Sequence, residues 1–577
     1  MRLLKLVISR FWHVMCYMFG KDQMGSLVMS GNTFFCGEIQ NWRELCAELG
    51  MGFSGKSGSA VQDGELLAAL YAKKGVAGFA EVRGPFAACF QMGNKTVLVR
   101  DPMGVSWLYY WTKDPRVCGT GVRQVLAQGV PRMLSVEGLW ACLLGGCMQE
   151  PFTMVEDVRS LSPGCVLTVA EDGTQKVERF WRPSFELENW KSRADAEDAV
   201  TAKLEETIAL PLGNDEVPCS FLSGGIDSST IVALLRRKHT GRIRTFCVIH
   251  EDPRTDERKW AKMVAERNET DHTEFMLTDA MMRDGIADAL AAYDQPSLDG
   301  LNVYFASKFA VEAGAKVVHS GEGGDELFVG YNQFAKPRMA YKWTPWFRWI
   351  PAFLGNALSI HGGSEKVRKL AQMFGCRYDP YFLTRRQFSP AWIVRLLTRD
   401  TRPDLVKLYA DQMTAVGTAG IDFGSDVINR SSWMEVRHDN LSMYMRDGFQ
   451  LGEAVGLVGR YPLMDASLAQ LLFTISGAWK CDSQLSKPLL VKAAGAGLPE
   501  EIIHRPKQGF SLPFDKYCRA GLKDELESFV RTGGTGLFKQ PEIVAIWQRY
   551  LCGKVSWMRI WHLFVVDDWC RRNGVKV

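Results

Sequence analysis

The stretch SGGIDSS at residues 223–229 constrains the fold of this chain more than any other part of it. It follows the apolar residues 217–222, which predict a short buried strand, and it precedes residues 230–235, which predict the first turns of a helix. A strand, a glycine pair and a helix N-terminus bring several backbone N–H groups around one concave site, where the positive end of the helix dipole reinforces them. The sequence therefore predicts an anion-binding turn.

The side chains of this turn suit a phosphate group and its counter-ion. Serine hydroxyls are donors for phosphate oxygens, and the carboxylate of Asp227 is a hard ligand suited to Mg²⁺. The stretch lacks the Gly-Lys-Ser/Thr of the Walker loop and the GxGxxG spacing of dinucleotide-binding loops. It resembles the PP-loop of ATP pyrophosphatases, enzymes that cleave ATP between its α and β phosphates and adenylate a substrate, which implies ATP and Mg²⁺ as cofactors. The nucleotide contacts that we expect here are Ser223, Gly224, Gly225, Asp227, Ser228 and Ser229.

The composition is that of an ordinary globular protein. A chain of 577 residues has room for roughly two or three domains, and a net charge of +4 gives no reason to expect a nucleic-acid partner. The fifteen cysteines form no C-x-x-C pair, so we expect reduced thiols and a cytoplasmic protein. Residues 1–14 form an apolar extension with basic residues, and no stretch has the roughly 18 uninterrupted apolar residues of a membrane span.

The first third of the chain alternates short β-type runs with turns. Such runs occur at residues 96–100, 107–111 and 165–169, and helical patterns occur at residues 42–49 and 63–71. This alternation predicts an α+β domain rich in antiparallel strands, which we place at residues 15–190.

Several motifs of this first domain resemble, in order, the glutaminase domain of glutamine-dependent asparagine synthetases. The resemblance implies an N-terminal-nucleophile-hydrolase-like fold, in which an antiparallel sandwich lies between helices. The motifs are GEIQNWREL at residues 37–45, DGELL at 63–67, EVRGPFA at 81–87, RDPMGV at 100–105, LYY at 108–110 and LSPG at 161–164.

The catalytic residues of a glutaminase are largely missing. The reaction needs a cysteine whose own α-amine is the base, but residue 2 is Arg2, and the MCYMFG stretch that resembles the family's start places its cysteine at Cys16. Tyr17 replaces the glycine after that cysteine, and Cys36 replaces the asparagine that supplies an oxyanion donor in the family. We expect a domain that is kept for its architecture and does not hydrolyse glutamine.

A polar stretch at residues 182–193 separates this domain from a second one, at residues 191–577. Strand-like runs there alternate with helical patterns, for example at residues 244–249, 257–267 and 316–320. Strands that alternate with helices predict a parallel sheet with ligands at the carboxyl ends of its strands. Together with the PP-loop, this indicates an α/β domain similar to the PP-loop ATP pyrophosphatases, which are adenine nucleotide α-hydrolase-like.

A second glycine-rich motif, SGEGGDELF at residues 320–328, follows one of the predicted strands. It resembles the SGEGxDELF signature of asparagine synthetases. The resemblance implies that Asp325 and Asp227 hold one metal ion, that the backbone of Leu222 and Val248 holds adenine, and that Ser320, Gly321 and Gly323 lie near the phosphates. It further implies that Lys507, in the family's RPKxxF motif, offsets the negative charge that builds up during adenylation and amide formation.

The acceptor region departs from this family. The stretch GLVGRYPLMD at residues 456–465 aligns with the family's GLExRxPFLD, so Val458 stands at the position of the catalytic glutamate. In β-lactam synthetases, a related branch with an inert N-terminal domain, a tyrosine pairs with that glutamate, and Glu322 occupies its position here. We count Glu322 with Lys507 as a candidate catalytic residue, and Glu453 as a weaker candidate for the missing base.

These departures favour an amine other than tunnelled ammonia as the nucleophile. The lasso peptide cyclases are similar in this respect, because they resemble asparagine synthetase, have a degenerate N-terminal domain and close a macrolactam between an α-amine and an Asp or Glu side chain. That resemblance implies a role in antibiotic biosynthesis, a precursor peptide as substrate and a leader-peptide protease as a possible partner. Aromatic stretches at residues 343–349 and 443–446 could line a peptide-sized cleft. Three alternatives remain open: an enzyme that uses free ammonia on a small acid, a β-lactam-synthetase-like cyclase, and a catalytically silent scaffold.

Overall fold

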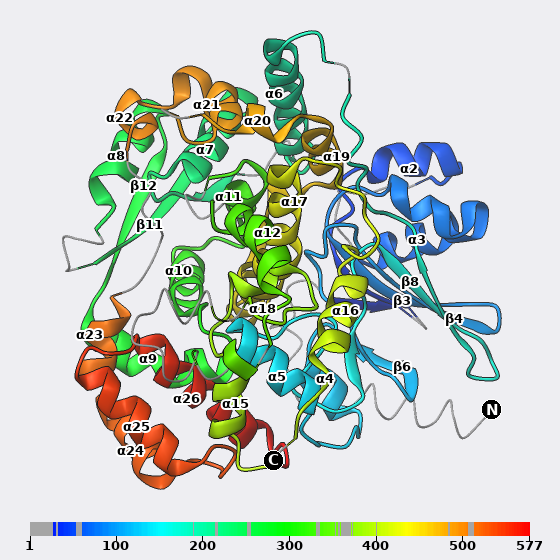
Figure 1. Cartoon of the computed structure of the whole chain (residues 1–577). Coiled ribbons are helices and arrows are strands. Elements are labelled where there is room, and N and C mark those ends of the chain that lie inside the picture. The colour runs from blue at the N-terminus through cyan, green and yellow to red at the C-terminus, as the bar shows by residue number, and fades with distance from the viewer. Residues whose placement is uncertain are drawn as a thin grey trace.

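Three β-sheets organise the structure, two of them antiparallel and one parallel (Figure 1). In Figure 1 the antiparallel sheets lie on the right, in blue and cyan, and the parallel sheet lies on the upper left. The computed structural model describes residues 27–30, 33–52, 60–188, 190–213, 217–250, 256–330, 335–351, 353–355, 358, 371, 373–399, 401–482, 485–505 and 513–577.

The first domain contains a six-stranded and a three-stranded antiparallel sheet. The larger sheet has the order β1 (Leu27–Ser30), β2 (Thr33–Gly37), β3 (Phe86–Met92), β4 (Lys95–Arg100), β8 (Cys165–Val169) and β9 (Gln175–Arg179). The smaller sheet has the order β6 (Asp114–Gly119), β5 (Tyr109–Trp111) and β7 (Val158–Ser160).

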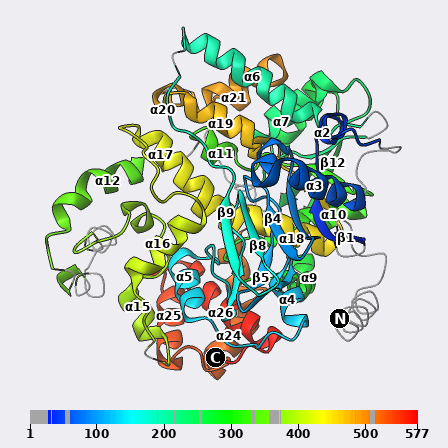
Figure 2. The ribbon, with the colours of Figure 1, turned by 90° about the vertical axis from the view of Figure 1, so that its right-hand side faces the viewer.

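Alternation along β4 explains why this domain is layered. Val97 and Val99 pack into the core under helices α2 (Trp42–Leu49) and α3 (Ala60–Lys74), whereas Leu98 packs into a separate core with Tyr110 of β5. Successive side chains of a strand point to opposite faces, so one sheet buries both of its faces. The expected antiparallel sandwich is thus observed, with its larger sheet facing the viewer in Figure 2.

The second domain is built on a five-stranded sheet of parallel strands. Its order is β12 (Asp271–Leu277), β11 (Arg244–His250), β10 (Cys219–Phe221), β13 (Val317–His319) and β14 (Val458–Arg460). Every neighbouring pair is parallel, which confirms the predicted parallel sheet.

The strand order places a switch point at the centre of this sheet. The chain moves from β10 outward through β11 to β12, and it then returns to the other side of β10 with β13, where Ser220 pairs with His319. Ligands of open α/β sheets bind at such a point, outside the carboxyl ends of the strands. The two predicted glycine-rich motifs follow β10 and β13, and the topology therefore brings them side by side.

Helices cover the parallel sheet and link it to the first domain. Helix α17 (Val427–Met434) continues into a buried π-helix (Glu435–Met445) and then into α18 (Arg446–Val455). The other helices of eight or more residues are α5 (Val136–Gly145), α6 (Arg193–Ala209), α7 (Ile226–Lys238), α8 (Arg258–Arg267), α9 (Asp279–Ala292), α10 (Leu301–Glu312), α12 (Ala335–Phe347), α16 (Leu405–Ala415), α19 (Ala466–Thr474), α24 (Lys523–Thr532), α25 (Gln540–Leu551) and α26 (Trp557–Asn573). The shorter ones are α4 (Val122–Ala127), α11 (Gly324–Leu327), α15 (Pro390–Leu396), α20 (Gly477–Lys480), α21 (Pro488–Ala494), α22 (Glu500–Ile503) and α23 (Phe514–Arg519).

Charged side chains tie the two domains together. Arg437 of the π-helix is fully buried and donates hydrogen bonds to the carbonyl oxygens of Met103 (3.0 Å) and Pro102 (2.7 Å). Arg460 of β14 forms a two-pronged ion pair with Glu38, at 3.0 and 2.8 Å. Because bidentate arginine–carboxylate contacts fix orientation as well as distance, the first domain is held in a set position against the parallel sheet.

The described elements match the sequence expectations for their type and nearly for their bounds. The predicted helices at residues 42–49, 63–71 and 257–267 correspond to α2, α3 and α8, and the predicted strands to β4, β5, β8, β10, β11 and β13. Across the described part of the chain, the structure contains no helix with the length and apolar character needed to cross a membrane.

Candidate functional site

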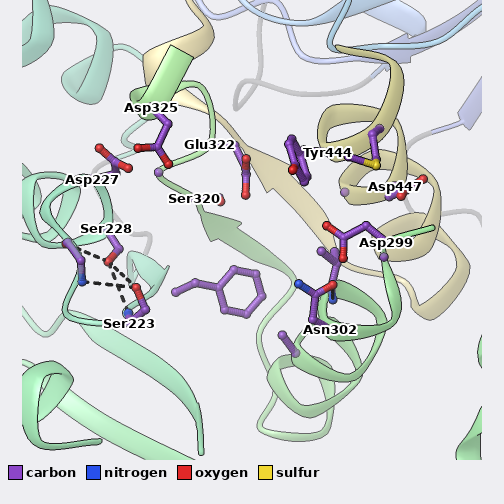
Figure 3. A pocket seen from close by; sticks show the side chains of 18 of the residues that line it. Ser223, Asp227, Ser228, Asp299, Asn302, Ser320, Glu322, Asp325, Tyr444 and Asp447 are labelled. Carbon is purple, nitrogen blue, oxygen red and sulfur yellow. Dashed lines mark hydrogen bonds between the residues drawn. The ribbon is translucent and has the colours of Figure 1, made fainter. Parts of the chain in front are cut away.

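A cavity of about 650 Å³ opens at the carboxyl ends of β10 and β13. Figure 3 shows its two ends: the SGGIDSS turn with Ser223, Asp227 and Ser228 on one side, and Asp299 and Asp447 on the other. The cavity therefore joins the predicted phosphate site to residues that the sequence motifs did not indicate.

Two serine hydroxyls of the turn form hydrogen bonds with its own backbone. The hydroxyls of Ser223 and Ser228 lie 3.2 Å apart, and each bonds the turn backbone: Gly225 N–H donates to Ser223 Oγ, and Ser228 Oγ donates to the Gly225 carbonyl, both at 3.3 Å. Helix α7 begins directly after Gly225. The turn thus presents a helix N-terminus and two hydroxyls to the cavity, which suits an anion.

Two glycines are required by close packing at this point. Gly224 has a φ of +71°, and a Cβ there would lie 2.5 Å from the backbone of Trp260. A Cβ on Gly321 would lie 2.9 Å from the backbone nitrogen of Ser228. The backbones of the two glycine-rich motifs therefore lie so close together that a side chain at Gly321 would clash with the backbone of Ser228.

Arg505 stabilises the turn through contacts with its backbone and with Glu257. Its guanidinium donates to the carbonyl oxygen of Gly224 (3.3 Å) and to the carboxylate of Glu257 (2.7 Å), and it stacks on Trp260. This arginine opens the predicted RPK motif, whereas Lys507, the predicted catalytic residue of that motif, lies outside the described residues.

Nine of the eleven predicted nucleotide contacts line the cavity. The two that do not are Gly224 and Ser229, and Ser229 is fully buried. The N–H of Leu222 already donates to the carbonyl of Phe246 at 2.8 Å. For the adenine contact that the sequence predicts, the carbonyl oxygen of Leu222 is therefore the backbone group that remains. The nine are Leu222, Ser223, Gly225, Asp227, Ser228, Val248, Ser320, Gly321 and Gly323.

The two predicted metal ligands converge on a lysine. The ammonium of Lys487 lies 2.5 Å from Oδ1 of Asp227 and 2.6 Å from Oδ1 of Asp325. Burial, the largest influence, lowers the pKa of Lys487, but the charges of the two aspartates outweigh it and raise that pKa above its usual value. A Cβ on Gly330 would lie 1.9 Å from Cε of Lys487, so a glycine is needed beside this ion triplet.

These carboxylates fit a magnesium ion that arrives with phosphate groups. Within the described ranges, no group of three or more His, Cys, Asp or Glu side chains could hold a metal. Mg²⁺ at nucleotide sites is typically bound by one or two carboxylates and completed by phosphate oxygens and waters. Asp227 and Asp325 already meet around one cationic centre, the ammonium of Lys487, which shows that the pair accommodates a positive charge.

Glu322 lies between the two ends of the cavity (Figure 3). Burial and the nearby charge of Glu322 raise the pKa of Tyr461, which also lines the cavity. A tyrosine and a glutamate therefore lie near each other in this cavity, although Val458, at the family's glutamate position, does not line it.

The far wall of the cavity carries three aspartates and a tyrosine. Asp439 and Tyr444 come from the π-helix, Asp447 from α18, and Asp299 from the loop before α10. π-Helical segments are rare and often occur at functional sites. The tertiary fold thus brings the loop before α10 against one continuous helical segment, which runs from the π-helix into α18.

Burial changes the acidity of two of these aspartates. Burial, followed by the charge of Asp439, raises the pKa of Asp299 to about 6 against a hydrogen bond from the Gly300 N–H. Burial raises the pKa of Asp447 to about 7, although Arg446 and Ser297 oppose the shift. Both carboxyl groups therefore titrate near neutral pH.

Several other sequence expectations can now be placed. Met443 and Tyr444 line the cavity, as expected for the stretch at 443–446, but Trp346 and Trp349 are 75% and 78% exposed and do not line it. Glu453, the weaker candidate base, is absent from the cavity lining as well.

The site residues that the sequence motifs missed are Lys487, Asp299, Asn302 and Asp447. Asp299 did have a local signal, because it stands in the turn-forming stretch QPSLDG between two helical patterns. Lys487 and Asp447 had none, since each lies beside an apolar helical run like many others.

In the first domain, Cys36 lies on β2 and is fully buried. Cys16 lies outside the described residues.

Comparisons with known proteins agree with this layout. The family models for the asparagine synthase and for the glutamine amidotransferase domain match residues 199–571 and 20–181. Asparagine synthetase [glutamine-hydrolyzing] 1 of Bacillus subtilis (strain 168) is 27% identical over 511 residues, which cover 86% of this chain and 77% of that protein. A putative asparagine synthetase [glutamine-hydrolyzing] of Mycobacterium tuberculosis (strain ATCC 25618 / H37Rv) is 26% identical over 562 residues, 93% of this chain and 83% of that one.

Among solved structures, glutamine phosphoribosylpyrophosphate amidotransferase from B. subtilis is 15% identical, and the match covers 51% of this chain and 63% of that one. Its TM-score of 0.18 is too low to indicate a shared fold. The asparagine synthase model, by contrast, matches more than half of the chain. The chain therefore belongs to the asparagine synthase family, whose matched domain supports ATP-dependent amide bond formation.

Proposed function

We propose that this protein adenylates a side-chain carboxylate with ATP and then joins the activated acyl group to an amine, and that it thereby closes the macrolactam of a lasso peptide precursor. One observation carries the proposal: a single cavity contains both the SGGIDSS turn and a wall of carboxylates suited to an amine. In the product, the peptide's N-terminal amine is joined to the side chain of an Asp or Glu residue.

In the first step the substrate carboxylate attacks the α-phosphorus of ATP. A C–O–P bond forms, the bond between the α-phosphorus and its bridging oxygen breaks, and pyrophosphate leaves with the electron pair. Mg²⁺, held by Asp227 and Asp325, would neutralise charge on the phosphates. The hydroxyls of Ser223 and Ser228 bind phosphate oxygens, and Lys507 offsets charge at the α-phosphate.

In the second step the amine attacks the carbonyl carbon of the acyl adenylate. The C–N bond forms, the C–O bond to AMP breaks, and AMP leaves with the electron pair. We assign Glu322 as the acceptor of the proton that the nitrogen loses, because Glu322 lies between the two ends of the cavity.

Two further features favour a peptide amine over ammonia released from glutamine. The residue at the family's oxyanion-donor asparagine is the buried Cys36, so the first domain lacks a part that ammonia production needs. The cavity also reaches Phe514 and Trp557, whose rings stack at 4.8 Å, and Met558, which is 41% exposed. Apolar side chains that continue to the surface suit a chain longer than a small acid.

The free cysteine thiols are consistent with a reducing compartment. Every cysteine in the described ranges is a free thiol, and we infer a cytoplasmic enzyme. In that compartment a protease that removes the leader peptide is the partner we expect.

The test supplies ATP, Mg²⁺ and a linear peptide with a free N-terminus and one internal Glu side chain. We expect AMP, pyrophosphate and a peptide lighter by one water, and the same peptide with an acetylated N-terminus should give no cyclised product. ADP and phosphate as products would contradict the adenylation. If peptides are not turned over while aspartate and ammonium react, the second candidate function holds in place of the cyclase: an enzyme that uses free ammonia on a small acid. The similarity to glutamine-hydrolysing relatives favours that candidate.

A further inference from the structure

The charges on the far wall of the cavity are only partly compensated. Asp439 pairs with Arg385, whose Nη1 lies 3.3 Å from its Oδ2. Asp447 accepts a hydrogen bond from Ser297 at 2.5 Å, and Arg446 lies 3.4 Å away. Two of the three carboxylates on this wall therefore have partners from the protein.

Asp299 has no ion-pair partner among the residues that the structure describes. Its backbone is fixed, because its N–H donates to Ser297 Oγ at 3.3 Å and its carbonyl accepts a hydrogen bond from Tyr293. The next residue, Gly300, has a φ of +97°, and a Cβ there would lie 3.1 Å from Oδ2 of Asp447. The loop thus holds a carboxylate that has no ion-pair partner among the described residues, although the Gly300 N–H donates to it, at the cavity wall beside a second carboxylate.

Tyr444 provides a second, independent sign of a ligand. Its side chain points into the cavity between Glu322 and Asp447 (Figure 3), and its hydroxyl makes no hydrogen bond to any described residue. Burial, with the charges of Asp439 and Asp299, raises the pKa of this phenol, so it stays neutral. This hydroxyl is not enclosed by protein and faces the open cavity, so it is available to hydrogen-bond a ligand there.

We propose that Asp299, Tyr444 and Asp447 form a subsite that binds a primary amine in its protonated form; this rests on the proposed function. The bound ammonium gives one proton to the Asp447 carboxylate and then attacks as the neutral amine, and Glu322 accepts the second proton, which the nitrogen loses once the C–N bond has formed. A half-buried carboxylate without an ion-pair partner, such as that of Asp299, is stabilised by a cation. An alkylammonium group has three N–H donors, and the wall offers three acceptors: two carboxylates and a phenol oxygen. In Figure 3, Glu322 lies between this subsite and the phosphate turn, so the amine passes Glu322 as it approaches the acyl group.

Binding of an amine can be measured without ATP. The probe is glycinamide, which carries the primary amine of a peptide N-terminus, and N-acetylglycinamide is its amine-blocked control. Calorimetric titration of the full-length protein should show binding of glycinamide and none of the acetylated compound. Asp299→Asn should weaken binding roughly ten- to a hundredfold, the usual loss for a charge-assisted hydrogen bond. The matched control is Asp411→Asn, an exposed aspartate on α16, and it should leave binding unchanged.

Equal binding of the acetylated compound, or equal affinity of glycinamide for Asp299→Asn and the wild type, would overturn the subsite. If Asp299→Asn does not unfold cooperatively, Tyr444→Phe takes its place, with an expected loss of roughly three- to tenfold. The same affinity for Tyr444→Phe would then also overturn it.

A kinetic readout separates this inference from the proposed function. With peptide substrate, Asp299→Asn should form much less cyclised product than the wild type. It should still form AMP when hydroxylamine is added to trap the acyl adenylate, because hydroxylamine is uncharged at neutral pH and does not need the amine subsite. Loss of both reactions would mean that Asp299 is not an amine subsite residue. Failure of the wild type to form AMP would contradict the proposed function and leave the glycinamide result to decide the subsite on its own.

Discussion

The Nζ atom of Lys487 lies 2.5 Å from Oδ1 of Asp227, although the two residues are 260 positions apart in the chain. Lys487 is buried and stands directly before helix α21, in a left-handed backbone conformation with a φ of +52°. The lysine compensates a carboxylate that is predicted to hold Mg²⁺. The ammonium of Lys487 therefore lies where the sequence motifs predict the charge of the metal ion.

Replacing Lys487 by Met should make folding depend on magnesium. The change leaves Asp227 and Asp325 buried without their shared cation, which should lower the free energy of unfolding by roughly 3–5 kcal/mol. Urea unfolding with and without MgCl₂ measures this, and Mg²⁺ should restore more stability to the variant than it adds to the wild type. Lys492→Met, on the same helix but outside the ion triplet, is the control. Equal responses of the two variants to Mg²⁺ would show that the aspartates do not form a cation site.

Replacing Asp227 or Asp325 by Asn should remove ATP-dependent product formation. Each change removes one of two carboxylates predicted to hold Mg²⁺ against the phosphates, and we expect a drop in AMP release of roughly a hundredfold or more. Chromatographic measurement of AMP gives the rate, with Asp284→Asn on the exposed face of α9 as the matched control. Unchanged turnover in either variant would refute its assignment as a metal ligand.

Replacing Asp299 by Asn should stabilise the ligand-free protein at neutral pH. Its pKa is raised to about 6 in the folded state, and an unfolded Asp titrates near pH 4. The folded state therefore binds the proton more tightly, so this residue makes stability fall as pH rises from about 4 to about 6, and the cost persists above that. We expect the variant to gain about 3 kcal/mol at pH 7 and little at pH 4.

Thermal unfolding across this pH range checks the sign. The charged and titratable groups around Asp299 are Asp439, Asp447, Tyr293 and Tyr444. These groups remain in both proteins, so the difference between the variant and the wild type reports on Asp299. A difference that does not change with pH would argue against a raised pKa.

Glutamine should not be a nitrogen source for this enzyme. Cys36 occupies the position where the family places an amide donor, and it is fully buried on β2. We expect no glutamate from glutamine, and we expect Cys36→Ala to keep ATP-dependent turnover, with a stability loss of about 1 kcal/mol from the deleted sulfur. An enzymatic glutamate assay decides the point. Release of glutamate in step with AMP would show a working glutaminase.

Local patterns along the chain determine much of this fold. Apolar spacing predicts α2 at residues 42–49, and the alternation of strands and helices after residue 191 predicts the parallel sheet. The SGGIDSS and SGEGGDELF motifs predict that two glycine-rich turns serve one ligand. These features follow from neighbouring residues along the chain, because helix period, strand alternation and glycine turns are local properties.

The other half of the site was decided only by the tertiary structure. The loop before α10 brings Asp299 to the cavity, the π-helix and α18 bring Tyr444 and Asp447, and the start of α21 brings Lys487. No local motif assigns Asp299, Asp447 or Lys487 to a site, because their importance lies in burial and in which charges face each other across the fold. The sequence by itself therefore determined the phosphate turn, and the packing of distant helices decided what lies opposite to it.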